Sequence, residues 1–188
     1  MRDVAVAQKC LLIVNLCHSI DKRTSDIYRR WSAEAPKDEL REFWADMAAE
    51  EQCHVTYWEK LQDWAQKGKL KGVFRKPNKL QATLQDISQR FADLEVRSRR
   101  ARRPRERFML AYELEFYLMN QALASALCLL DPFCGDGKPI QAYDRHIVML
   151  IRTCNEHCRP TTSLKLLGDT LYSLWEERIH HACKHAAG

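Results

Sequence analysis

The sequence predicts an all-α fold, and three observations support this prediction. Apolar residues recur at intervals of three and four along most of the chain, which is the period of an amphipathic helix. The alternation of apolar and polar residues that is typical of strands is nearly absent. The six glycines and six prolines are few and cluster between the helical segments. With 188 residues, the chain is long enough for a substantial core, and we expect a single domain, 1–188.

The first two helices are expected to form a hairpin over residues 4–67. The first helix runs over about 4–33. Pro36 opens the second helix, because proline is tolerated in the first turn. Gly68 and Gly72 follow the end of the apolar pattern and mark where the second helix stops.

The segment 68–103 is expected to be a long crossover between two hairpins. A short amphipathic helix lies within it. Its apolar residues are Leu80, Leu84, Ile87, Phe91 and Leu94.

A second hairpin is expected over residues 104–181. Its first helix covers 104–130, and the Asp-, Gly- and Pro-rich segment 131–139 is a loop. Its second helix covers 140–181. Pro160 is expected to kink this helix without ending it, because the apolar stripe stays in register beyond the proline.

The net charge of +5 is unevenly distributed along the sequence. Residues 67–107 hold fourteen Lys or Arg and four acidic residues, a balance of +10, whereas the remainder has a balance of −5. Seven arginines lie in the segment from Arg97 to Arg107, and no aromatic residue is interleaved with them. We therefore interpret this run as a solvated segment and expect no nucleic acid partner.

The cysteines and the apolar segments indicate the compartment. None of the eight cysteines forms a CxxC motif, which argues against a rubredoxin-type or zinc-ribbon module. Reduced thiols in a cytoplasmic protein fit this pattern better than a disulfide scaffold. The apolar patch 11–16 is too short to span a membrane, so we expect no membrane association and no signal peptide.

Ionisable residues interrupt the apolar stripes of the predicted helices. Glu51 and His54 lie in mid-stripe on the second helix, three residues apart, and so point the same way. Buried ionisable groups are costly unless they are paired or bind a metal ion. Their stripe is Leu40, Trp44, Met47, Glu51, His54, Trp58 and Leu61.

The other three long helices each carry a similar interruption. Asp21 lies in the stripe of the first helix, Glu115 in that of the third, and Cys154 with His157 in that of the fourth. Glu113 is two residues from Glu115, so only one of the two can face inward, and we favour Glu115. The predicted metal ligands are therefore Asp21, Glu51, His54, Glu115, Cys154 and His157.

This order of motifs resembles the ferritin-like superfamily and, within it, the rubrerythrin-like proteins. Residues 21–61 carry the best match, through Asp21, Tyr28 and the stretch 48–54, which reads AAEEQCH. Residues 108–160 match more loosely. The resemblance implies an antiparallel four-helix bundle with one long crossover, a di-iron carboxylate site and redox chemistry on peroxide or dioxygen. It also implies an external electron donor and allows a homodimer.

Two departures from the family pattern leave alternatives open. Cys154 stands where the family has a bridging Glu, and Asp21 is one methylene shorter than Glu. A single iron or zinc ion is one alternative, with the Cys154 thiolate as a ligand to zinc. The other is a non-catalytic, metal-free bundle that serves as an interaction module, in which the buried Glu and His residues satisfy one another.

Overall fold

A computed structural model describes residues 2–70, 72–74, 76–119, 123, 126, 138–158 and 161–186. Every regular element in these ranges is a helix, so the prediction of an all-α protein is confirmed. None of the described helices combines the length and hydrophobicity needed to cross a membrane. The helices are α1 (Arg2–Glu34), α2 (Asp38–Gln66), α3 (Pro77–Arg100), α4 (Pro104–Leu118), α6 (Lys138–Cys158) and α7 (Thr162–Ala186).

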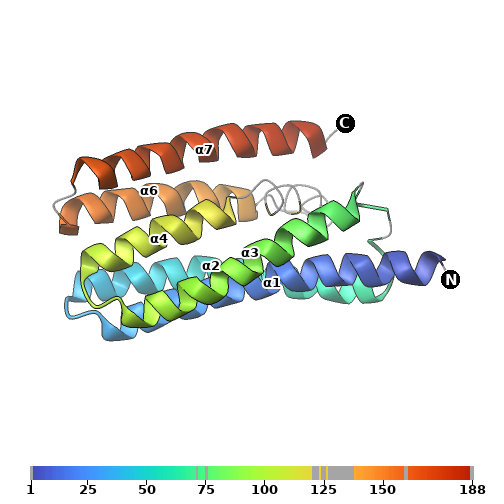
Figure 1. Ribbon diagram of the computed structural model, residues 1–188, viewed down its shortest axis with the longest axis horizontal. Coiled ribbons are helices and arrows are strands. Elements are labelled where there is room, and N and C mark those ends of the chain that lie inside the picture. The colour runs from blue at the N-terminus through green and yellow to red at the C-terminus, as the bar shows by residue number, and fades with distance from the viewer. Residues whose placement is uncertain are drawn as a thin grey trace.

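Helices α1 and α2 pack against each other in the segment 4–67, where the sequence predicts a hairpin. A three-residue link joins them, and α2 runs back along α1 (Figure 1). Asp38 and Glu39 lie in the first turn of α2, where carboxylates interact favourably with the helix dipole. After α2 the chain turns at Gly68, whose φ of 68° is readily adopted only by glycine.

Helix α3 is longer than the short crossover helix that the sequence predicts. It covers 24 residues and packs along α1. Arg23 of α1 donates hydrogen bonds to the Ser88 carbonyl oxygen at 2.9 Å and to Glu95 at 3.0 Å. The buried face of α3 extends the predicted apolar stripe by one turn, to Ser98. Most of the predicted crossover, 68–103, is therefore a helix that packs on α1.

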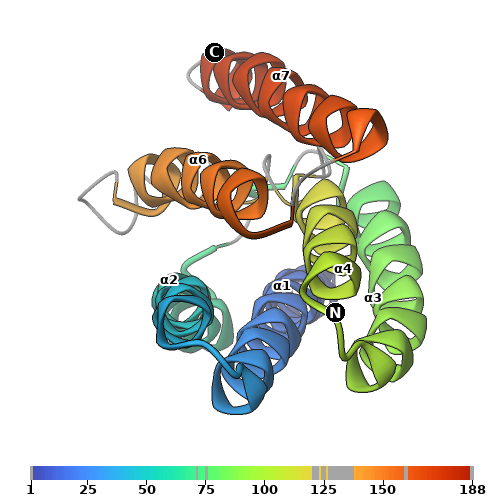
Figure 2. The same ribbon diagram turned by 90° about the vertical axis from the view of Figure 1, so that its left-hand side faces the viewer.

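The prediction of one kinked helix over 140–181 is wrong. Helix α6 ends at Cys158, and α7 begins at Thr162 and runs back alongside α6 (Figures 1 and 2). Proline lacks a backbone N–H and clashes with the preceding turn, so a helix interior around position 160 is costly. The in-register residues beyond it are buried because α7 packs on α4 and α6: Leu164, Leu171 and Trp175.

The end view in Figure 2 shows how the helices surround the interior. Helices α1, α2, α4 and α6 stand around a common centre, with α3 beside α1 and α4, and α7 over α4 and α6. The predicted third helix, 104–130, is not continuous, because α4 ends at Leu118. Its predicted end at 130 and positions 131–137 of the predicted loop 131–139 lie outside the described residues, and α6 begins within that loop, at Lys138. The ferritin-like connectivity and the division into hairpins 4–67 and 104–181 stay predictions.

Candidate metal centre

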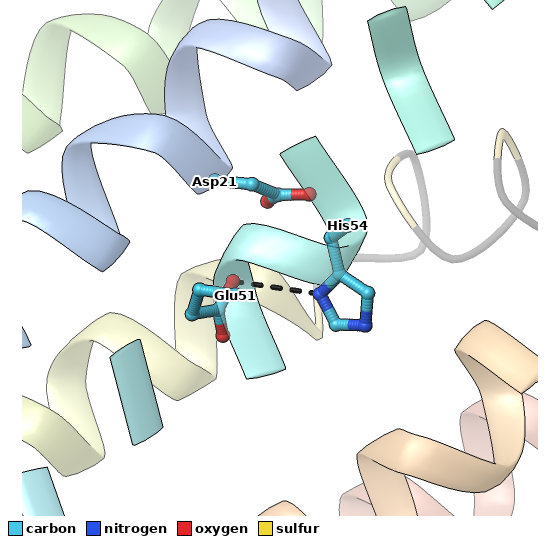
Figure 3. Close-up of side chains that lie close together, drawn as sticks. All are labelled: Asp21, Glu51 and His54. Carbon is cyan, nitrogen blue, oxygen red and sulfur yellow. Dashed lines mark ion pairs between the residues drawn. The ribbon is translucent and has the colours of Figure 1, made fainter. Parts of the chain in front are cut away.

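Three ionisable side chains from α1 and α2 meet in the interior. Asp21, Glu51 and His54 are buried, and one ligand atom from each lies within 4.8 Å of the others. Figure 3 shows the two carboxyl groups and the imidazole ring turned toward a common space. Asp21 comes from the middle of α1, and the other two come from successive turns on one face of α2.

A second group lies next to the first and shares Glu51 with it. Glu51, Glu115 and His146 are buried, and one ligand atom from each again lies within 4.8 Å of the others. These residues come from α2, α4 and α6. The two groups together therefore join all four helices that surround the interior.

Glu51 lies between the two histidines. Its Oε2 is 3.5 Å from Nδ1 of His54, and its Oε1 is 3.6 Å from Nε2 of His146. Both contacts are ion pairs when the imidazole is protonated, but neither Glu51 oxygen accepts a hydrogen bond from any residue that the structure describes. The side chain is fully buried. A buried carboxylate without a donor is costly, unless another group such as a cation supplies the missing interaction.

Neighbouring donors orient the two outer carboxylates. The hydroxyl of Tyr28 donates to Oε1 of Glu115 at 2.6 Å, and the indole N–H of Trp58 donates to Oδ2 of Asp21 at 2.5 Å. Oε2 of Glu115 has no hydrogen-bond partner among the described residues. Each outer carboxylate is therefore held through one oxygen while its second oxygen is left for another contact.

His146 is held between two carboxylates. Its Nε2 lies 2.8 Å from Oε1 of Glu115, and its Nδ1 lies 3.1 Å from Oε2 of Glu50. A carboxylate on the ring nitrogen that faces away from a metal ion fixes the orientation of the imidazole and raises its basicity. Glu50, which is partly exposed, lies in that position relative to the interior.

Burial and mutual charge set the protonation of the cluster. Burial, followed by the charge of Glu51, raises the pKa of Asp21 to about 7, although His54 and the Trp58 hydrogen bond act in the opposite direction. Burial alone would lower the pKa of both histidines. The neighbouring carboxylates outweigh it, so that Glu51 raises the pKa of His54 and Glu115 raises that of His146 well above its usual range. In the absence of metal, protons compensate part of the negative charge.

Four of the six predicted ligands belong to these two groups: Asp21, Glu51, His54 and Glu115. The choice of Glu115 over Glu113 agrees with the structure, because Glu113 pairs with Arg97 at 2.7 Å on the outside of α4. The two groups do not include Cys154 or His157.

Cys154 and His157 lie farther along α6. Cys154 is buried beside Tyr112 and Cys158, whereas His157 is half-buried. Cys154 follows His146 by eight residues, which corresponds to about 12 Å along a helix axis. Hydrogen bonds from Cys158 and Tyr112, against the effect of burial, lower the pKa of Cys154 to about 7. A role as ligands for these two residues stays a prediction.

His146 is not among the ligands that the sequence predicts. It fits the apolar stripe of the fourth helix as well as Ile147 does, since it follows Tyr143 by three residues and precedes Leu150 by four. The sequence favours Cys154 and His157 because this pair has the spacing of the Glu51–His54 motif. Residues 143–146 have the same spacing, with Tyr in place of Glu. The signal in the sequence was therefore a histidine on the apolar stripe of the fourth predicted helix, one turn after Tyr143 and one turn before Leu150.

Comparison with protein-family models and with curated proteins finds no match to this chain. The resemblance to rubrerythrin-like proteins therefore rests on the residues themselves. The arrangement offers three carboxylates and two imidazoles in a buried volume, and such groups could hold a metal ion. Oxygen and nitrogen donors of this kind suit several divalent transition metals.

Proposed function

We propose that this protein is a ferritin-like, rubrerythrin-like antiparallel bundle that binds two iron ions in its interior and carries out redox chemistry on peroxide or dioxygen. Asp21 and His54 would hold one ion, and Glu115 and His146 the other. Glu51 would bridge the two. This set has one Glu-x-x-His motif and one carboxylate from each of α1 and α4, as in di-iron bundles, with Tyr143 at the position of the second motif's Glu.

The position of Glu51 carries the proposal. It belongs to both groups of candidate ligands, its two oxygens face two different histidines, and neither oxygen has a hydrogen-bond donor among the described residues. A bridging carboxylate needs this arrangement, because each oxygen must reach a separate ion. A metal-free core in which Glu and His satisfy one another would place at least one donor on this carboxylate.

The donor set favours iron among the available metals. Carboxylate and imidazole ligands are typical of non-haem iron, whereas structural zinc sites usually include thiolates. The three carboxylates also leave part of the charge of two divalent ions uncompensated, which makes one ion, iron or zinc, the closest alternative. Iron, when bound, supplies reversible one-electron oxidation between the ferrous and ferric states.

The chain itself would position the ligands and exclude water. Tyr28 and Trp58 hold the two outer carboxylates by hydrogen bonds, and Glu50 orients His146. Trp44 stacks on the Tyr28 ring at 5.6 Å between centroids. Both rings are fully buried and cover this side of the carboxylates.

Metal content after anaerobic loading tests the proposal. The protein is refilled with ferrous iron and, separately, with zinc. With ferrous iron it should hold about two ions per chain, and peroxide should then oxidise them. Glu51→Gln, which keeps the shape and removes the charge, should lower iron content to one ion or none. Glu42→Gln is the matched control, because Glu42 is an exposed residue of the same helix.

Other results of the same measurement would contradict the proposal in distinct ways. One tightly held zinc ion, with iron bound weakly, would replace the di-iron centre by a mononuclear site. No bound metal under either condition would favour a non-catalytic bundle in which the 2.8 Å contact between Glu115 and His146 serves the structure alone.

A further inference from the structure

A surface rich in exposed arginine lies where α3 ends and α4 begins, at the same end of the molecule as the turn between α1 and α2 (Figure 1). We define this basic surface by its exposed residues, which are Arg97, Arg99, Arg100, Arg102, Arg103 and Arg105.

Acidic side chains neutralise only part of the basic surface. Glu113 pairs with Arg97 at 2.7 Å, and Glu34 pairs with Arg102 at 3.3 Å. The other four arginines form no ion pair with any residue in the described parts of the chain. The surface therefore keeps a positive excess that faces solvent.

The effect of this charge reaches the residues beneath it. Burial lowers the pKa of Arg30, and the charges of Arg99 and Arg102 lower it further, although Glu34 raises it. Arg30 lies under the surface and donates a hydrogen bond to the Ser98 hydroxyl at 2.6 Å. Arg30 thus links the arginines of the basic surface to Ser98, the last buried residue of α3.

An uninterrupted series of close contacts leads from this point to the candidate metal centre. The indole N–H of Trp31 donates to the Ser98 carbonyl oxygen at 3.1 Å. The Trp31 ring lies 5.8 Å from the Tyr28 ring, and the Tyr28 hydroxyl donates to Glu115 at 2.6 Å. Trp44 contacts both rings, at 4.9 Å from Trp31 and 5.6 Å from Tyr28. All three aromatic side chains are fully buried.

We propose that the basic surface is the docking site of an acidic one-electron donor protein, whose electrons reach the iron centre through Ser98, Trp31 and Tyr28. This inference rests on the proposed function and adds to it the class of partner and its place on the molecule. In each encounter the reduced donor loses one electron and one ferric ion becomes ferrous. Two encounters reduce a pair of ions, and no covalent bond forms or breaks.

The contacts favour an acidic redox protein over a nucleic acid. No aromatic side chain belongs to the basic surface, so bases would have nothing on which to stack. The aromatic residues lie beneath it, where they connect with the metal centre and could not reach a nucleic acid. Complementary charge raises association rates, which suits a donor that must bind and leave at each turnover.

Charge reversal tests the docking site. The probe is an acidic [2Fe–2S] ferredoxin, and its binding to the metal-free protein is measured by calorimetry at low and high salt. Arg99→Glu combined with Arg100→Glu should weaken binding about tenfold or more at low salt. Lys76→Glu combined with Lys79→Glu is the matched control at the opposite end of α3, because Lys79 lies about 30 Å from Arg99 along the helix axis. Both of its lysines are exposed.

Stopped-flow re-reduction of the ferric protein tests electron entry. The rate with reduced ferredoxin should fall as salt rises, and it should fall about tenfold in the Arg99/Arg100 variant but not in the lysine control. Trp31→Phe should leave ferredoxin binding unchanged while slowing this reduction. A small neutral reduced dye, which needs no docking site, should reduce all variants at similar rates.

Two results would overturn the inference. Equal ferredoxin binding by the wild type and the Arg99/Arg100 variant would remove the docking site. Salt-dependent binding of duplex DNA that the same variant abolishes, with ferredoxin reduction unchanged, would assign the surface to nucleic acid. Failure of the proposed function is recognised separately, since iron content and peroxide oxidation are measured without ferredoxin, and ferredoxin binding is measured without iron.

Discussion

Asp21, Glu51 and Glu115 place three carboxyl groups in a buried interior, where His54 and His146 supply the positive charge among the described residues of the two groups. Charge in such an environment is costly, and the cost falls when the groups are protonated, paired or bound to a cation. The raised pKa of Asp21 and of both histidines shows the first of these responses. Protons and metal ions therefore compete for the same residues, and metal affinity should rise with pH.

The metal-free protein should lose stability as pH rises. The folded-state pKa of Asp21 is about 7, and the unfolded value is about 3.9. Between these values the folded chain holds a proton that the unfolded chain has released, so the free energy of unfolding falls by up to about 1.4 kcal/mol per pH unit. The raised pKa values of His54 and His146 act in the same direction above about pH 6.5.

Thermal melts of the metal-free protein check this expectation. The Tm should fall between about pH 4 and about pH 8, and Asp21→Asn should flatten the curve between about pH 4 and about pH 7. Asp46→Asn on the exposed face of α2 is the control. A stability that rises with pH over this range would contradict the assignment of protons to the buried cluster.

The two histidines of α6 should differ in their effect on metal binding. His146 lies within 4.8 Å of the Glu51 and Glu115 carboxylates, whereas His157 belongs to neither group of candidate ligands. His146→Gln should therefore lower iron content, and His157→Gln and Cys154→Ala should leave it unchanged. Metal analysis of the three variants shows whether His146, or instead Cys154 and His157, binds iron. Loss of iron in His157→Gln alone would restore the ligand set expected from spacing.

At the scale of elements, α7 is the part of the fold that the sequence pattern misplaced. It returns along α6 and covers α4 through a close contact at Gly168. A Cβ atom at this position would lie 3.3 Å from the Tyr112 hydroxyl and 3.4 Å from a side-chain carbon of Ile151. The absence of a side chain at position 168 thus lets α7 approach its neighbours.

Substitutions at Gly168 should separate helix propensity from packing. Gly168→Ala gains up to about 1 kcal/mol of helix propensity, which offsets its tight contact, so its stability should stay close to that of the wild type. Gly168→Leu cannot be accommodated without displacing Tyr112 or α7, and should cost about 1–3 kcal/mol. Denaturant unfolding measures both. A fully stable Leu variant would show that α7 does not pack at this distance.

At the scale of the whole molecule, the two groups of candidate ligands join α1, α2, α4 and α6. Metal loading should therefore stabilise the entire core and not one helix. At a free metal concentration one hundred times Kd the gain is about 2.7 kcal/mol, which corresponds to about 5–10 °C in Tm for a chain of this size.

Calorimetry of the loaded and chelator-treated protein measures this stabilisation. The increase in Tm should disappear on chelation and should be smaller in Glu51→Gln, or absent if that variant binds no ion. Amide hydrogen exchange should slow in all four core helices on loading. Protection confined to α1 and α2 would instead indicate a single ion held by Asp21, Glu51 and His54.

The sequence by itself determined the helical class, the hairpin of α1 and α2, and the inward positions of Asp21, Glu51, His54 and Glu115. These features depend on periodicity within a single helix, which is local and can be read without knowing any partner element. The sequence predicts too short a helix for α3, because the apolar stripe ends at Leu94. The next residue on the buried face is Ser98, which is polar and is buried because α1 packs against it.

Only the tertiary structure decided which residue of α6 meets Glu51 and Glu115 in the interior. Tyr143–His146 and Cys154–His157 share one spacing and one stripe, so the period of α6 cannot distinguish them. The register of α6 against α2 and α4 selects His146, at 2.8 Å from Glu115. The direction of α7 was decided in the same way, since a break near Pro160 allows either a kink or a reversal, and the apolar surface of α4 and α6 that α7 covers favours the reversal.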